Sequence, residues 1–202
     1  MPDAVPDRVF SGVGYYDQLG SVVGSAGDMN GDGHPDVFAS APYNDAGALN
    51  AGAIYVWFGG PAFDTTPDLT LAGSGVNEHL MNAANAGDVN GDGFSDLIGA
   101  DNDHVFVWFG GSHPNSVPDL TLARRYASVA GAGDVDGDGT DDFVVGAAVR
   151  RYGRPCFRLL WWKRRGHCRG PALRRGSPRR RHGHMRRGWG TRGRPGPHGC
   201  GC

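Results

Sequence analysis

The chain has 202 residues, the length of one domain or of a piece of a larger protein, and a formal net charge of −1. All 21 acidic residues lie at or before Asp142, whereas 17 of the 20 basic residues lie at or after Arg150, so residues 1–149 carry −18 and residues 150–202 carry +17. No apolar run approaches the ~18 residues of a membrane helix, and a strongly acidic segment repels nucleic acid. The composition therefore predicts no membrane span and no nucleic-acid partner.

Two sequence motifs alternate along the acidic part of the chain. One reads Ala-Gly-Asp-x-[Asn/Asp]-Gly-Asp-Gly-x-x-Asp and occurs three times; its last nine residues are called the first, second and third acidic loops (28–36, 88–96 and 134–142). The other reads aromatic-Val-Trp-Phe-Gly-Gly and is followed by Pro-Asp-Leu-Thr-Leu, at 55–60 with 67–71 and at 106–111 with 118–122. Repeats of this length indicate a fold built from repeated supersecondary units.

Each repeat is predicted to consist of short strands. A β-branched or aromatic run follows every acidic loop, at residues 37–39, 97–99 and 143–145. In the strand 54–58, Ile54, Val56 and Phe58 face one side while Tyr55 and Trp57 face the other, so both faces are apolar and need a layer on each side. Blades of a β-propeller supply such layers, and a two-sheet sandwich fits less well. Residues 42–52, absent from the second repeat, are predicted to form a surface loop.

The predicted fold is therefore all-β: a partial β-propeller of about two blades plus the start of a third. We expect an N-terminal extension at residues 1–9, propeller repeats at 10–148 and a basic tail at 149–202.

The acidic loops are predicted to bind metal ions. Oxygen ligands at alternate positions let a short loop wrap one cation, and Gly at the sixth position suits the sharp turn. Oxygen-only ligation favours Ca²⁺ over Zn²⁺, and Mg²⁺ keeps more water. A solvated acidic turn is the alternative, against which three copies with identical spacing argue. The predicted ligands of up to three Ca²⁺ ions are the side chains of Asp28, Asn30, Asp32 and Asp36, of Asp88, Asn90, Asp92 and Asp96, and of Asp134, Asp136, Asp138 and Asp142, with the carbonyl oxygens of His34, Phe94 and Thr140.

An EF-hand is the main competitor for these loops. It requires a bidentate acidic residue at the twelfth position, where this chain has Ala39, Gly99 and Val145. The flanking segments are rich in glycine and β-branched residues, which does not suit helices. The sequence therefore favours a loop between strands.

The order of these motifs resembles FG-GAP repeats, which form the β-propeller of integrin alpha chains and occur in bacterial surface proteins. The resemblance covers about residues 10–148 and rests on Leu19-Gly20-Ser21-Val22, the first acidic loop, the strand ending at Pro42 and the Trp-Phe-Gly-Gly element. It implies a Ca²⁺ ion in a hairpin loop within each blade. The chain departs from the family in having Leu19 for the usual Phe, in lacking a counterpart of Pro42 in later repeats, and in having fewer than the usual seven blades.

The tail from Arg150 contains no acid and is dominated by Arg, Gly, Pro, Cys and Trp. The tail could be interpreted as a basic nucleic-acid-binding arm or as a zinc site. The spacing of its cysteines argues against zinc, because it lacks the paired Cys-x-x-Cys motifs of such sites. A third interpretation is that the tail is translated in a shifted reading frame. The codons of Trp161-Trp162-Lys163, read one base later, must encode Gly-Gly, in register with Gly59-Gly60 of the repeat. We infer a frameshift near residues 148–153 and expect a tail without selected structure, and therefore disordered.

The resemblance implies a calcium-binding fragment of an extracellular or cell-surface adhesion protein whose partner is a protein or a carbohydrate. The alternative is an accessory propeller of a secreted hydrolase, such as a glycosylphosphatidylinositol phospholipase D-like enzyme, and a weaker option is nucleic-acid binding through the tail. No catalytic constellation is recognisable, because His34, His79, His104 and His113 are scattered, so no enzymatic activity is expected. Residues 1–7 do not resemble a signal peptide, so we expect a truncated start. Unclosed blade faces are expected to self-associate. Strand 143–147 loses the strand that should follow it in the repeat, so we expect an unpaired edge there.

Overall fold

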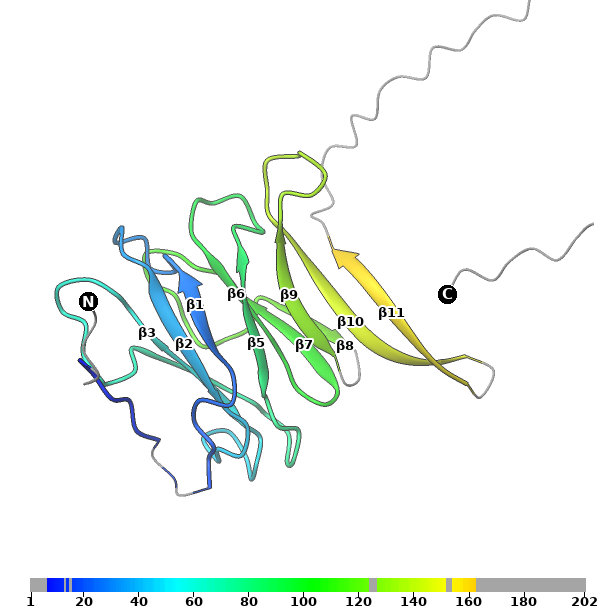
Figure 1. The fold of residues 1–202 in the computed structure, drawn as a ribbon, viewed down its shortest axis with the longest axis horizontal. Helices are drawn as coiled ribbons and strands as arrows, with labels where there is room; N and C mark the ends of the chain where they lie inside the picture. Colours follow the sequence, from blue (N-terminus) through cyan, green and yellow to red (C-terminus); the bar gives the residue numbers. More distant parts are fainter. Residues whose placement is uncertain (1–6, 13, 15, 124–126, 152–153, 163–202) are drawn as a thin grey trace, which may run out of the picture. The chain divides into compact units, whose positions relative to one another are not determined.

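The fold is known from a computed structural model that describes residues 7–12, 14, 16–123, 127–151 and 154–162, all within one unit of residues 1–164. These residues form three antiparallel sheets, and within them no helix is long and apolar enough to cross a membrane (Figure 1). The first sheet has the order β1-β2-β3-β4, the second β5-β6-β7-β8 and the third β11-β10-β9. The strands are β1 Val23–Gly27, β2 Asp36–Ala41, β3 Ala53–Trp57, β4 Leu69–Ala72, β5 Asn82–Gly87, β6 Asp96–Ala100, β7 His104–Trp108, β8 Leu120–Ala123, β9 Ser128–Gly133, β10 Asp142–Arg151 and β11 Arg154–Trp162.

Each acidic loop joins the first two strands of its sheet. Just before the loop, the strand register shifts at a glycine with positive φ: Gly27 (77°), Gly87 (77°) and Gly133 (67°). Glycine adopts this left-handed conformation without the steric cost that a Cβ atom imposes. The Ala-Gly-Asp start of the motif therefore turns the chain out of the sheet and into the loop.

The apolar residues of each strand fill two separate cores, one on each face. Ile54 and Val56 of β3 pack with Phe106 and Trp108 of β7, between the first and second sheets. On the other face of β7, Val105 and Val107 pack with Phe143 and Val145 of β10, between the second and third sheets. Because the second sheet is buried on both faces, the sheets succeed one another as blades of a propeller, which confirms the predicted all-β, partial propeller.

The residues predicted to alternate in the third strand of the first blade do so. Ile54 and Val56 lie in the core shared with the second blade, whereas Tyr55 and Trp57 lie in a cluster on the opposite face. Residues 42–52 form the predicted loop between β2 and β3, whose two ends and Asn44 are buried while Tyr43, residues 45–47 and Leu49 are exposed.

The start of the basic tail differs from the sequence-based expectation. We expected no structure from residue 149 onward and an unpaired edge along 143–147, yet β10 continues to Arg151 and β11 pairs with it from Phe143↔Trp162 to Arg151↔Arg154. The expectation of an unpaired edge is therefore wrong. Residues 157–162 are mostly aromatic and aliphatic, types that favour strands next to an available edge. The remainder of the tail, residues 163–202, lies outside the described residues.

The two outermost blade faces have no blade packed against them among the described residues. On the first blade, Phe10 reaches over Trp57 (ring centroids 4.7 Å apart) beside a hollow of about 450 Å³. On the third blade, Val135 is 58% exposed, although its counterparts Met29 and Val89 are 0% and 8% exposed under the following blade. The second residue of the acidic loop is thus buried in the first two blades, which a following blade covers, and exposed in the third, which no described blade follows.

Candidate metal centres

The first Asp of each acidic loop organises the loop backbone. In the second loop, Oδ1 of Asp88 accepts hydrogen bonds from the backbone N–H groups of Gly91 (2.6 Å) and Asp92 (3.0 Å), and Oδ2 accepts one from Gly93 (2.8 Å). Gly91 and Gly93 have positive φ, which the tight turn requires. Asp28 and Asp134 make the equivalent three bonds in their loops. A short loop is thereby curled around one carboxylate.

The third and fifth positions direct further oxygens into the same turn. Asn90 Oδ1 accepts the N–H of Asp92 at 2.8 Å, and Asp92 Oδ1 accepts the N–H of Phe94 at 3.0 Å. The first loop repeats both bonds, and the backbone N–H of His34, followed by the Asn30 side chain, lowers the pKa of Asp32. In the third loop, carboxylate oxygens of Asp134, Asp136 and Asp138 lie within 4.8 Å of one another.

The ninth residue of each loop is a fully buried brace. Asp36 accepts the N–H of Met29 on one oxygen (2.7 Å) and of Gly59 on the other (2.8 Å). Asp96 does the same with Val89 and Gly110, both at 2.9 Å. In the first two loops, the brace ties the acidic loop to the glycine pair that follows the third strand. The Trp-Phe-Gly-Gly element and the loop are therefore parts of one structure.

Burial dominates the electrostatics of these braces. It raises the pKa of Asp96 to about 7, against the opposing effect of the Gly110 and Val89 N–H groups, and the charges of Asp92 and Asp88 raise it further. The pKa of Asp36 is raised as well, chiefly by burial and further by the charges of Asp32 and Asp28, against the opposing effect of the Gly59 and Met29 N–H groups. A carboxylate that resists ionisation beside other carboxylates is stabilised in its charged form by a bound cation.

The third brace differs from the first two. Asp142 Oδ2 accepts the N–H of Val135 at 3.0 Å, but its buried Oδ1 has no hydrogen-bond partner among the described residues. Gly59 and Gly110, the partners in the other repeats, follow Trp57 and Trp108 by two residues, and no such glycine follows Trp162. The third loop therefore lacks the glycine N–H that completes the brace in the first two loops.

Neighbouring acidic loops are joined to each other. Asp28 donates its N–H to Ser95 Oγ (3.2 Å) and accepts the Ser95 N–H on its carbonyl (3.0 Å). Asp88 makes the same pair of bonds with Asp141, at 2.9 Å each. Ser95 and Asp141 occupy the eighth position of the following loop. The first residue of the first and of the second predicted site is thus held by the loop of the next blade.

The donor set of the loops fits a calcium ion. All side-chain donors at the predicted positions are oxygens, and carboxylate oxygens that accept one N–H retain a second lone pair for a cation. The structure brings the first, third and fifth positions of each loop together and buries the ninth beside them. The contributions of the His34, Phe94 and Thr140 carbonyl oxygens stay predictions.

A second pair of acidic braces was missed from the sequence. Asp68 and Asp119 accept the backbone N–H groups of Phe58 (2.7 Å) and Phe109 (2.8 Å). Both belong to the repeated Pro-Asp-Leu-Thr-Leu element, and the repetition of this acidic residue is the sequence signal that could have revealed its structural role. These carboxylates fix the start of the fourth strand rather than a metal site.

Comparisons with known proteins agree with this architecture. Residues 19–57, which run from the approach to β1 to the end of β3, match the FG-GAP repeat family. Residues 19–57 thus match one FG-GAP repeat, and the chain is similar to integrin alpha chains. It is 37% identical over 90 residues to integrin alpha-3 of Cricetulus griseus, covering 41% of this chain and 9% of that protein. It is 37% identical over 106 residues to integrin alpha-PS5 of Drosophila melanogaster, covering 48% of this chain and 11% of that one.

A relative of another kind also matches. The chain is 32% identical over 127 residues to the phosphatidylinositol-glycan-specific phospholipase D of Mus musculus, covering 54% of this chain and 15% of that protein. The matched part of the chain thus spans 9–15% of the length of the relatives described here.

Proposed function

We propose that this chain is a calcium-stabilised FG-GAP propeller segment of an extracellular or cell-surface protein that binds a protein or carbohydrate partner. The observation that carries the proposal is the shared geometry of the three acidic loops. In each, one carboxylate gathers three backbone N–H groups and further oxygens converge on the same turn. Such loops bind Ca²⁺ at extracellular concentrations, on the order of 10⁻⁴–10⁻³ M.

Calcium has a structural role in this proposal. Without a cation, three or four carboxylates crowd each loop and repel one another. Because consecutive loops are hydrogen-bonded through Ser95 and Asp141, an ion in one loop also orders the edge of the next. The blades would then present a rigid surface for a binding partner.

The test is a thermal melt of the full chain in EGTA and in millimolar Ca²⁺, with Mg²⁺ at the same concentration as control. We expect Ca²⁺ to raise the melting temperature, and Mg²⁺ to raise it less. A melting temperature that is the same in EGTA and Ca²⁺ overturns the proposal.

The similarity to the phospholipase D favours a second candidate, an accessory propeller of a secreted hydrolase. Calcium binding is common to both candidates. The parent gene distinguishes them, because a hydrolase requires a catalytic domain outside the propeller repeats.

A further inference from the structure

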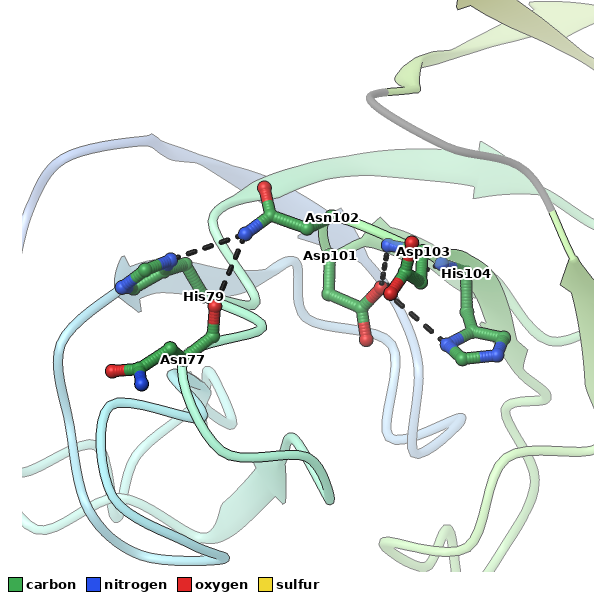
Figure 2. A network of polar contacts seen from close by, with 6 residues as sticks. All are labelled: Asn77, His79, Asp101, Asn102, Asp103 and His104. Atoms are coloured by element: carbon green, nitrogen blue, oxygen red, sulfur yellow. Dashed lines mark hydrogen bonds and ion pairs between the residues drawn. The ribbon is translucent and has the colours of Figure 1, made fainter.

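A second group of metal-ligand side chains lies at the end of the second sheet remote from its acidic loop. Glu78 precedes β5, Asp101 directly follows β6, and His104 begins β7. One potential ligand atom from each of the three lies within 4.8 Å of the others. Figure 2 shows the Asp101 and His104 side chains on the short connection between β6 and β7. No sequence motif marks this group, because 22 residues separate Glu78 from Asp101.

Asp101 supplies an oxygen that nothing in the described part of the chain uses. Its Oδ1 accepts the backbone N–H groups of Asp103 (2.7 Å) and His104 (2.6 Å) and lies 3.6 Å from His104 Nδ1. Its Oδ2 is buried and has no hydrogen-bond partner there, and the residue is only 3% exposed. A buried carboxylate oxygen without a donor calls for a cation or a proton.

Glu78 brings a second such oxygen to the same place. Its Oε2 is also buried without a partner among the described residues. The carboxylate folds back over Gly75, where any Cβ atom would overlap it. Burial and then the charge of Asp101 raise the pKa of Glu78, His104 lowers it, and a side-chain contact with Asp101 that can share one proton raises it further. Two carboxylates therefore crowd together beside one imidazole.

The surrounding network fixes the two segments in register (Figure 2). The backbone N–H of Asn102 donates to the Glu78 carbonyl at 2.8 Å. Its side-chain Nδ2 donates to the Asn77 carbonyl (3.1 Å) and lies 3.2 Å from His79 Nδ1. His79 is thus engaged with Asn102, which leaves His104 as the histidine of the cluster. Its side chain is 36% exposed, so solvent reaches the site from that side.

We propose that Glu78, Asp101 and His104 bind one divalent transition-metal ion, with Zn²⁺ as the best match. An imidazole beside two carboxylates suits Zn²⁺ better than Ca²⁺ or Mg²⁺, which prefer oxygen alone. Tetrahedral ligands at about 2.1 Å from zinc are about 3.4 Å apart, close to the 3.6 Å between His104 Nδ1 and Asp101 Oδ1. Three protein ligands leave a fourth position for water or a partner's side chain. The site is independent of the calcium loops.

The test is isothermal titration of Zn²⁺ into the full chain in millimolar Ca²⁺, which fills the acidic loops. All proteins carry serine in place of Cys156, Cys168, Cys200 and Cys202, so that tail thiols do not contribute. Asp101→Asn keeps the oxygen that accepts the two backbone N–H groups, and His104→Gln removes the imidazole. His113→Gln, in an exposed loop of the same blade, is the matched control.

We expect the Asp101→Asn and His104→Gln chains to lose one zinc equivalent, or to bind it more than about 10-fold more weakly, while His113→Gln matches the parent. The metal-free melting temperature of Asp101→Asn should equal or exceed that of the parent, because a carboxylate without a counter-ion is removed. Equal zinc stoichiometry and affinity in all four chains would overturn the proposal and leave a proton shared between Glu78 and Asp101. A calcium-dependent melt that persists in both variants keeps this test separate from the proposed function.

Discussion

Replacing Asp88 by alanine separates the two contributions that an acidic loop makes to stability. The substitution removes the acceptor of three backbone N–H groups, at 2.6, 3.0 and 2.8 Å, and one calcium ligand. Three partly exposed hydrogen bonds contribute about 2 kcal/mol together. At 10 mM Ca²⁺, a site with Kd on the order of 10⁻⁴–10⁻³ M adds about 1.4–2.7 kcal/mol. We therefore expect a loss of about 2 kcal/mol in EGTA and about 3–5 kcal/mol in Ca²⁺.

Urea denaturation in EGTA and in 10 mM Ca²⁺ measures both quantities. Asp64→Ala is the control, because Asp64 accepts one N–H, from Thr66, in an exposed turn away from the acidic loops. It should lose at most about 1 kcal/mol, equally in both buffers. If calcium stabilises Asp88→Ala as much as the parent chain, then Asp88 holds no ion and the assignment of the second loop is wrong.

The remaining predictions concern pH, the open blade face and the tail. The folded-state pKa of Asp96 is about 7, above its usual 3.8, so between these two values the folded chain holds a proton that the unfolded chain has released. In EGTA the free energy of unfolding should therefore fall as the pH rises from about 4 to about 7. Asp96→Asn should flatten that fall, and equal slopes in denaturant titrations would contradict it. Val135→Lys should change the free energy of unfolding by less than about 0.5 kcal/mol, whereas Met29→Lys at the equivalent buried position should lower it by more than about 3 kcal/mol. Sedimentation should show weaker self-association for Val135→Lys. Equal destabilisation by the two substitutions would mean that a fourth blade covers Val135. Deleting residues 163–202 should leave the calcium titration unchanged, and a lost site would assign the tail a role in the loops.

The parts of the fold that repeat were predictable from the sequence. The acidic loops, the strands after them and the two-faced strand 54–58 are local patterns, and each is confirmed by the sheets and cores. The repeated glycines mark the left-handed turns before and within each loop. Local chemistry sufficed here because each repeat contains its own signals.

Features that depend on distant contacts were not predictable. Whether β11 pairs with β10 depends on an available edge, which no residue of the tail reveals. The zinc cluster unites Glu78 with Asp101 and His104 only because β5 and β6 pair antiparallel, so that the segment before β5 lies beside the segment after β6. The hydrogen bonds between Asp28 and Ser95 likewise join residues 67 positions apart, because the acidic loops of consecutive sheets lie side by side. The frameshift interpretation and the extracellular setting stay predictions.

Counting the calcium ions bound by the full chain tests the central claim most directly. Isothermal titration of the EGTA-treated and desalted protein with Ca²⁺ should give about three equivalents, with affinities on the order of 10⁻⁴–10⁻³ M. Replacing Asp28, Asp88 and Asp134 together by alanine should abolish this binding. A parent chain that binds no Ca²⁺ at millimolar concentration, or a triple variant that binds as the parent does, would contradict the assignment of the acidic loops.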